Sequence, residues 1–218
     1  MCAYDEAYLD GAMRNLGEAF DYAVNACHMN GDEFLSLFVS SGLADDFGHG
    51  SPGIVSGRSG TELVMETLEK SGIMISFPEP QTEYNCSPEY WCGWALAYYQ
   101  WKTGRSFRSI HECISMEDVL KLYPIMHEAS EDRFVDTVNH MIFRKNSPSR
   151  LQRQRKRCGY SQRELAQKSG VNLRTLQQYE LKAKDIGKAS VKTVMALSSV
   201  LGCPVEEILE YEEDDSEV

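Results

Sequence analysis

The stretch that decides the fold of the C-terminal part is SQRELAQKSGVNLRTLQQYE, residues 161–180. Ser161 followed three residues later by Glu164 forms a capping box, which predicts the start of a helix. Gly170 is suited to a turn, and Asn172 is an N-cap for a second helix. Two short helices joined by a turn of three or four residues that contains glycine form a helix-turn-helix unit.

The neighbouring sequence supplies the rest of a small helical bundle. A basic helix is expected over residues 149–158, and Ser190 opens a helix that Gly202 ends. Residues 203–209, CPVEEIL, predict a short fifth helix. The side chains expected to pack the two central helices are Leu165, Ala166, Val171, Leu176 and Tyr179.

Residues 147–210 resemble the Cro/repressor (XRE-type) helix-turn-helix family, because the turn, capping and packing positions of residues 161–180 all match its motif. The resemblance covers under a third of the chain. It implies a five-helix domain that binds a double-stranded DNA operator. The connector LKAKDIGKAS, residues 181–190, is longer than the usual tight turn of this family.

The net charge of −11 conceals three segments of different sign. Residues 1–143 hold 8 Lys+Arg and 22 Asp+Glu, residues 144–209 hold 14 and 5, and residues 210–218 hold 0 and 6, so their net charges are −14, +9 and −6. A compact basic block is typical of a phosphate-binding surface, although a solvated basic face is the alternative. We expect an all-α acidic domain over residues 1–143, a DNA-binding domain over 144–210 and a flexible acidic tail over 211–218.

The helix that follows Asn172 is expected to lie in the major groove with its N-terminal residues at the base edges. Arg can bridge guanine O6 and N7, Gln can bridge adenine N6 and N7, and Leu can contact a thymine methyl. The expected base contacts are Leu173, Arg174, Thr175, Gln177 and Gln178. The alternative is that these side chains are only solvent-exposed helix residues.

A second set of side chains is expected to contact phosphates, which adds affinity without sequence information. By resemblance to the family, Gln162 would hydrogen-bond a phosphate and brace the recognition side chains. The basic members of the set are Arg150, Arg153, Arg157, Lys168, Lys182 and Lys188. A homodimer is expected because one module reads only a few base pairs and two-fold half-sites supply the missing specificity.

Residues 1–143 show helical periodicity almost throughout. The glycine-rich residues 48–60 predict a loop, and two prolines make residues 73–86 an extended connector. The candidate N-caps are Asp32, Ser59, Ser87 and Ser115. Five aromatic side chains crowd one side of the helix expected from Ser87 to Thr103, which is typical of a core face and also of a partner groove: Tyr90, Trp91, Trp94, Tyr98 and Trp101.

Catalytic and metal-binding motifs are not found in the sequence. The seven cysteines form no C-x-x-C pair, and the five histidines form no H-E-x-x-H motif. The glycine-rich loop lacks the phosphate-binding patterns, and no G-x-S-x-G elbow occurs. Without a signal peptide or a long apolar run, we expect a reduced, cytoplasmic protein with no membrane segment, no catalytic activity and no metal or cofactor.

The role of residues 1–143 has three interpretations. Regulators of this type often pair the DNA module with a domain that oligomerises, senses a ligand or grips a partner. The arrangement resembles bacterial or phage regulators in which an antitoxin domain neutralises a toxin and the DNA module represses the operon. A ligand-responsive repressor and a phage-type inhibitor of a host nuclease or defence system are the alternatives. The acidic tail is expected either to compete with DNA phosphates or to aid solubility.

Overall fold

The computed structural model describes residues 2–73, 76–79 and 87–210 of the chain. Helices and loops make up these residues, with no strand among them, so the all-α prediction is confirmed. The chain divides into two compact units, Met1–Ile142 and Phe143–Val218, each with its own hydrophobic core. They are called the N-terminal unit and the C-terminal unit below.

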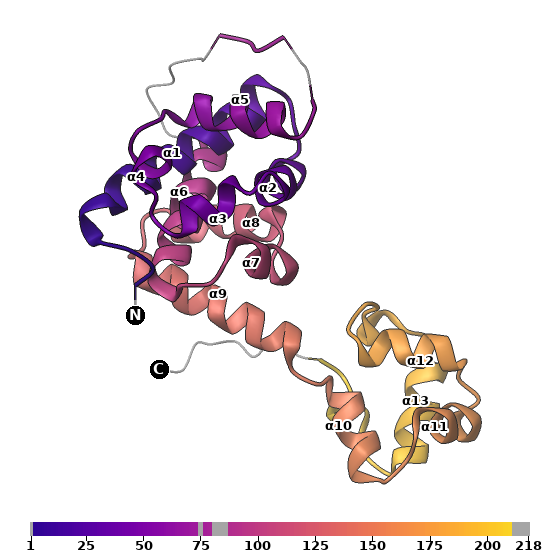
Figure 1. Ribbon diagram of the computed structural model, residues 1–218. Coiled ribbons are helices and arrows are strands. Elements are labelled where there is room, and N and C mark those ends of the chain that lie inside the picture. The colour runs from indigo at the N-terminus through magenta and orange to yellow at the C-terminus, as the bar shows by residue number, and fades with distance from the viewer. Residues whose placement is uncertain (1, 74–75, 80–86, 211–218) are drawn as a thin grey trace. The chain divides into compact units, whose positions relative to one another are not determined.

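The N-terminal unit is a packed set of short and medium helices in which α1 lies along α6 (Figure 1). Residue 142 near the end of α9 is the last of this unit. Its elements are η1 (Glu6–Tyr8), α1 (Leu9–Asp21), the π-helical η2 (Tyr22–Ala26), α2 (Gly31–Ser40), α3 (Leu43–Gly48), α4 (Pro52–Val55), α5 (Gly60–Lys70), α6 (Pro88–Thr103), α7 (Phe107–Cys113), α8 (Met116–Met126) and α9 (Glu131–Asn146).

Three helices of this unit begin where the sequence predicts. At α5 the Ser59 Oγ accepts a hydrogen bond from Glu62 N (3.3 Å), and Glu62 Oε2 accepts one from Ser59 N (2.8 Å). The same reciprocal capping box starts α8 with Ser115 and Asp118. At α6 the N-cap is Ser87, and a proline occupies the first helical position. Local capping chemistry therefore sets these helix starts.

The prediction that Asp32 caps α2 is wrong. Asn30 holds the cap position with an extended backbone, and its Oδ1 accepts hydrogen bonds from the backbone N of Asp32 (2.8 Å) and of Glu33 (3.3 Å). Asp32 Oδ1 instead accepts a hydrogen bond from Met116 N (2.8 Å) and so joins α2 to the start of α8. Both residue types favour caps, and only the one with non-helical backbone angles serves as one.

The glycine-rich segment predicted as a loop contains one helical turn, α4. Its proline is at the first helical position, where the missing N–H is not needed, and Ile54 and Val55 are buried beneath it. The remainder of residues 49–59 is irregular, as predicted. Of the connector predicted over residues 73–86, residues 74–75 and 80–86 lie outside the described part, and residues 76–79 form neither helix nor strand.

Two glycines allow α1 to approach its neighbours closely. A Cβ atom at Gly93 of α6 would lie 2.3 Å from the carbonyl oxygen of Leu16, and one at Gly60 of α5 would lie 2.4 Å from the backbone N of Ala19. Backbone atoms do not yield to such contacts as a flexible side chain does. These two positions therefore bring α5 and α6 onto the backbone of α1.

The aromatic side chains of α6 belong mainly to the core. Trp91 and Trp101 are 8% and 7% exposed, while Trp94 and Tyr98 are partly buried against the same core. Tyr99, which the sequence pattern did not single out, is fully buried, and its hydroxyl donates a hydrogen bond to Asn139 Oδ1 (2.8 Å). Core packing therefore explains most of the aromatic stripe.

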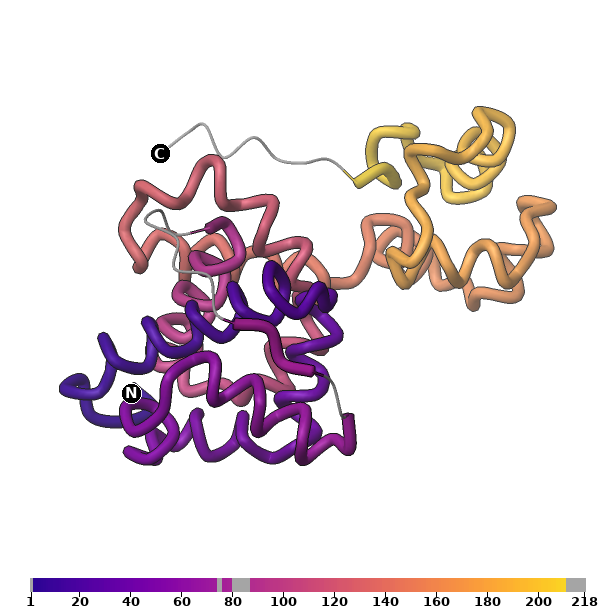
Figure 2. The backbone as a smooth tube through the Cα atoms, turned by 90° about the horizontal axis from the view of Figure 1, so that it is seen from above, coloured from indigo at the N-terminus to yellow at the C-terminus, as the bar shows by residue number. Residues whose placement is uncertain are grey.

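The C-terminal unit is a bundle of short helices, traced from orange to yellow in Figure 2. The fifth predicted helix is present as a single 3₁₀ turn, η4. The predicted acidic tail, residues 211–218, lies outside the described residues. The elements are α10 (Arg150–Arg157), α11 (Gln162–Ser169), α12 (Leu173–Glu180), η3 (Ile186–Lys188), α13 (Val191–Leu201) and η4 (Val205–Glu207).

The core of this unit contains the side chains that the sequence predicts. Leu165 and Leu176 are fully buried, Ala166 and Tyr179 are 7% and 5% exposed, and Val171 packs against them. The long connector between α12 and α13 is held at its centre because Ile186 is also buried. The additional length thus forms an ordered turn, η3, whose Ile186 packs into the core of the unit.

Candidate nucleic-acid interface

The arrangement of α11 and α12 follows from three local devices. The capping box of Ser161 and Glu164 starts α11, and Gly170 ends it in the left-handed conformation with φ of 70°. The Asn172 side chain then accepts hydrogen bonds from the backbone N of Arg174 (2.9 Å) and of Thr175 (3.4 Å) at the start of α12. The predicted helix-turn-helix geometry is therefore present.

The predicted base contacts differ in how much side chain they present. Arg174 is exposed, and Thr175, Gln177 and Gln178 are half-buried. Leu173 is also half-buried, and it packs against the core of the unit. All five lie on α12, so the helix carries a mixed polar and apolar face that Arg174 dominates.

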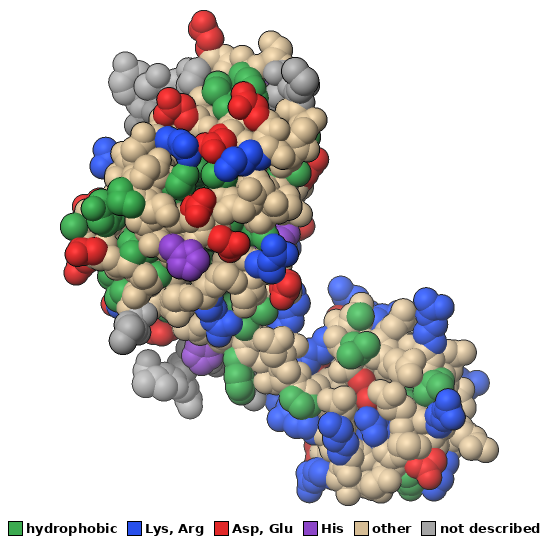
Figure 3. Space-filling view, in the orientation of Figure 1, with side chains coloured by type: hydrophobic (Ala, Val, Ile, Leu, Met, Phe, Trp, Pro, Cys, Tyr) green, Lys and Arg blue, Asp and Glu red, His purple; other side chains and the backbone are tan. Residues whose placement is uncertain are grey.

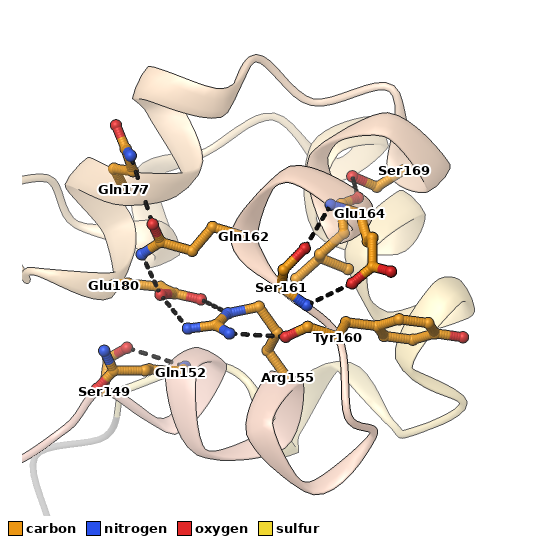
Figure 4. A network of polar contacts seen from close by, with 11 residues as sticks. Ser149, Gln152, Arg155, Tyr160, Ser161, Gln162, Glu164, Ser169, Gln177 and Glu180 are labelled. Atoms are coloured by element: carbon orange, nitrogen blue, oxygen red, sulfur yellow. Dashed lines mark hydrogen bonds and ion pairs between the residues drawn. The ribbon is translucent and has the colours of Figure 1, made fainter.

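A buried polar network stands behind this face (Figure 4). Arg155 Nε and Nη2 of α10 donate hydrogen bonds to Glu180 Oε1 (2.5 Å) and Oε2 (2.9 Å) at the end of α12. Arg155 Nη1 donates a third one to the carbonyl of Tyr160 (2.7 Å). Gln162 Nε2 donates to Glu180 Oε2 (2.8 Å), and Gln177 Nε2 donates to Gln162 Oε1 (3.4 Å). One carboxylate thus joins α10, α11 and α12.

The buried charges of the network are paired with each other. Arg155 is 8% exposed and Glu180 is 3% exposed, and the hydrogen bond to Glu180 raises the pKa of Arg155 above its ordinary value. A bidentate arginine–carboxylate pair fixes geometry as well as charge. Removal of one partner from such a buried pair typically costs about 3 to 5 kcal/mol, because the other charge is left uncompensated.

Gln162 lies where it links this network to α12. Its Nε2 is held by Glu180, and its Oε1 faces the Gln177 side chain of α12. Gln162 thus contacts Gln177, one of the side chains expected to contact bases, and that it braces this side chain on DNA stays a prediction. The predicted contact of Gln162 with a phosphate stays a prediction.

Sequence reasoning missed the roles of Arg155 and Glu180. The charge pattern groups Arg155 with the other basic residues of its helix, and it shows Glu180 only as the end of the recognition helix. A signal is present, because Leu151 and Arg155 are four residues apart and share one helix face. Leu151 is the apolar side chain of α10, so a cation on its face needs a buried anion.

The predicted phosphate contacts fall into three places. Arg153 and Arg157 are exposed on α10, and Arg150 is half-buried at its first position. Lys168 of α11 is exposed, with its Nζ 4.4 Å from the centre of the Tyr160 ring. Lys182 and Lys188 lie in the connector after α12, where Lys182 Nζ donates a hydrogen bond to the carbonyl of Arg144.

Among the charged side chains on the visible surface of this unit, the basic ones predominate. Figure 3 shows Lys and Arg spread over the face of the C-terminal unit, with few Asp or Glu side chains between them. In the N-terminal unit the same view shows acidic and basic side chains intermixed. The net charge of +9 over residues 144–209 is thus displayed at the surface.

Within residues 2–73, 76–79 and 87–210, no group of three or more His, Cys, Asp or Glu side chains is placed to hold a metal ion. Over the same ranges, each helix is too short or too polar to span a lipid bilayer.

The comparison with protein families agrees with the helix-turn-helix geometry of α11 and α12. Residues 151–208 match the family model described as helix-turn-helix. No curated protein and no solved structure matches the chain. The matched segment contains α11 to α13, all of α10 except its first residue, the Arg155–Glu180 pair and the exposed Arg174. Residues 151–208 are a helix-turn-helix domain of the Cro/repressor (XRE) type, the DNA-binding module of a transcriptional regulator.

Proposed function

We propose that the protein is a sequence-specific, double-stranded DNA-binding autorepressor that reads its operator with α12. The observation that carries this proposal is the placement of Arg174 on a helix that the Arg155–Glu180–Gln162 network fixes from behind. A recognition side chain on a rigid element retains its bidentate geometry toward a base.

The proposed mechanism separates reading from positioning. Arg174 bridges guanine, Gln177 and Gln178 bridge adenine, and Leu173 and Thr175 contact the thymine methyl or neighbouring edges. The cations of α10, α11 and the connector contact phosphates and fix the register of the helix on the duplex. In this proposal the protein is not an enzyme, since it acts by occupying DNA, and its place is the cytoplasm.

Selection of bound duplexes from a random pool tests the proposal, with sizing of the selected complex. The expected result is an enriched two-fold symmetric site, with half-site centres about 34 to 36 Å apart and two chains per duplex. Recovery of random sequences would overturn sequence-specific reading. An enriched asymmetric site with one chain bound would overturn the homodimer alone.

The proposed homodimer has candidate contact residues on the C-terminal unit. Leu181, directly after α12, is 74% exposed, and Val191 and Met195 of α13 are 75% and 57% exposed. Val191 and Met195 are one helical turn apart on the same side of α13. Large apolar side chains that are this exposed on a basic domain support a contact with a second copy bound to the adjacent half-site.

For the N-terminal unit we propose binding of another protein, as in an antitoxin that neutralises a toxin. Its net charge of −14 suits a basic partner, and Ile125 on α8 is 72% exposed. Co-purification of the full chain with the product of the adjacent reading frame, and loss of that product's toxicity, are the expected results. Growth arrest that persists when both proteins are produced would contradict this role.

The ligand-responsive alternative receives no support from the pocket between α6, α8 and α9. This pocket, lined by Trp91, Trp94, Met126 and Phe134, encloses about 10 Å³. That volume corresponds to about one water molecule, whereas small-molecule sites enclose roughly 300 to 1,000 Å³. The inhibitor alternative is tested by nuclease assays with the full chain.

A further inference from the structure

A stripe of cations runs along the outer face of α10. At 3.6 residues per turn, Arg153 lies opposite the buried Leu151 and Arg155, with Arg150, Lys156 and Arg157 beside it. Arg153, Lys156 and Arg157 are exposed, and Arg150 is half-buried. We call these four residues the α10 cation stripe. The helix thus has an inner face that fixes α12 and an outer face that is strongly basic.

The last described residues of the chain run back along the same helix. Glu207 Oε2 accepts a hydrogen bond from Gln154 Nε2 (2.5 Å), and Glu210 Oε1 accepts one from the backbone N of Arg150 (2.6 Å). Residue 207 therefore lies beside the middle of α10, and residue 210 lies at its first turn. A carboxylate at a helix N-terminus is favourable because the unpaired N–H groups point toward it. The chain leaves the described region next to the stripe.

The segment that follows has the charge and the length to cover the stripe. Residues 211–218, YEEDDSEV, contain five acidic and no basic residues. Eight extended residues span roughly 26 to 29 Å, whereas the seven helical steps from Arg150 to Arg157 span about 10 Å. We propose that residues 211–218 bind the α10 cation stripe when DNA is absent and leave it when DNA phosphates take their place.

The proposal has a specific thermodynamic consequence, and it rests on the proposed DNA binding. If the tail must leave the stripe before any duplex binds, the affinities for operator and for non-operator DNA are reduced by the same factor. The ratio of the two affinities is then unchanged. The tail sets how much of the protein is bound at a given salt concentration, and α12 sets where it is bound.

Tail binding is measured first without DNA. Amide NMR spectra of the ¹⁵N-labelled full chain are compared with those of a variant carrying Glu212→Gln, Glu213→Gln, Asp214→Asn, Asp215→Asn and Glu217→Gln. The expected shift differences lie at the amides of α10 at about 50 mM salt and vanish at about 500 mM, where charges are screened beyond a few ångströms. Differences confined to α12 or to the N-terminal unit, or none outside the tail, would overturn the proposal.

The second experiment uses titrations with operator and non-operator duplexes. Tail neutralisation is expected to tighten both affinities about tenfold at about 50 mM salt and less than twofold at about 300 mM. The control variant loses five exposed carboxylates of the N-terminal unit: Asp10→Asn, Asp46→Asn, Glu69→Gln, Glu112→Gln and Asp136→Asn. Equal effects of both variants would show that net charge alone acts, which overturns the proposal.

The two experiments separate the possible failures. If the NMR differences at α10 are present and no duplex is bound at any salt concentration, the proposed DNA-binding function fails and the tail contact stands. If the operator is bound and tail neutralisation changes neither the spectra nor the affinities, the tail contact fails and the proposed function stands.

Discussion

The two units use ion pairs differently. In the N-terminal unit, Lys102 and Asp132 are 2.8 Å apart with side chains 41% and 66% exposed. In the C-terminal unit, the paired side chains of Arg155 and Glu180 are 9% and 0% exposed. An exposed pair contributes about 0 to 1 kcal/mol, whereas a buried pair fixes the elements that carry it. The Lys102–Asp132 pair thus lies at the surface of its unit, and the Arg155–Glu180 pair joins α10 to α12 in the interior of its unit.

The largest expected effect comes from removing one partner of the buried ion pair. Arg155→Met leaves Glu180 buried without its partner, and we expect the free energy of unfolding of the C-terminal unit to fall by about 3 to 5 kcal/mol. The exposed control, Lys102→Met, is expected to cost less than about 1 kcal/mol. Urea unfolding measures both.

A double variant tests whether the unpaired charge of Glu180 causes this loss of stability. Arg155→Met with Glu180→Leu removes both charges, so most of the stability lost in the single variant is expected to return. If Arg155→Met costs no more than Lys102→Met, the buried pair does not have the role assigned to it.

The next largest effect is the loss of stability expected when either of two glycines, Gly93 or Gly170, is replaced by alanine. Gly93 allows two helices to pack closely, and Gly170 allows a left-handed turn. Gly93→Ala places a Cβ 2.3 Å from a backbone oxygen of α1, and we expect a loss of about 3 kcal/mol from overpacking. Gly170 has φ of 70°, and a Cβ there would meet no atom within 4 Å, so Gly170→Ala is expected to cost about 1 to 2 kcal/mol from backbone strain. Thermal unfolding of the two variants is the measurement, and a larger loss at Gly170 would contradict the close packing of α1 against α6.

A smaller effect concerns positioning on DNA. Arg157→Ala removes one phosphate contact, so the slope of log affinity against log salt is expected to fall by about 0.9 while all duplexes weaken alike. Arg133→Ala, an exposed arginine of the N-terminal unit, is the matched control and should leave the slope unchanged. A slope that changes equally in both variants would remove Arg157 from the interface.

The smallest expected effect is the pH dependence of stability that comes from two capping boxes, one in each unit. Hydrogen bonds from the backbone N of Ser59 and of Ser161 lower the pKa of Glu62 and of Glu164 below the ordinary 4.5. Each carboxylate therefore adds stability above the ordinary pKa, and this stability is lost as the pH falls through the lowered value. Glu62→Gln and Glu164→Gln are expected to flatten the decline in unfolding free energy between about pH 5 and pH 3. If the free energy of unfolding of both variants falls with pH as it does in the unsubstituted protein, the capping boxes do not depend on the charge of their glutamates.

The fold of the C-terminal unit could be predicted further than that of the N-terminal unit, because its signals are local. Capping at Ser161 and Asn172 and the turn at Gly170 depend on residues two to three positions apart. The contact of Gly93 with α1 joins residues far apart in sequence, and the choice of Asn30 instead of Asp32 as the cap of α2 depends on backbone angles although both residues are nearby. Local capping and turn signals can be predicted directly from the sequence. Backbone angles and contacts between distant residues are known only from the folded structure.

The same distinction applies to the candidate site. The exposed position of Arg174 follows from helical periodicity, and the sequence correctly predicted it on the surface of α12. The Arg155–Glu180 pair joins residues 25 positions apart, and charge counting assigns Arg155 to the basic surface. A buried ion pair becomes visible in the sequence only when the packing of both helices is known.

The most direct test of the central claim, that α12 reads DNA sequence, is a second selection from random duplexes with the Arg174→Ala variant. The expected result is a site that has lost preference at one base pair of each half-site, at a cost of about 1 to 3 kcal/mol there, with the other positions unchanged. A selected site identical to that of the unsubstituted protein, or a uniform loss of affinity over all duplexes, would contradict the claim.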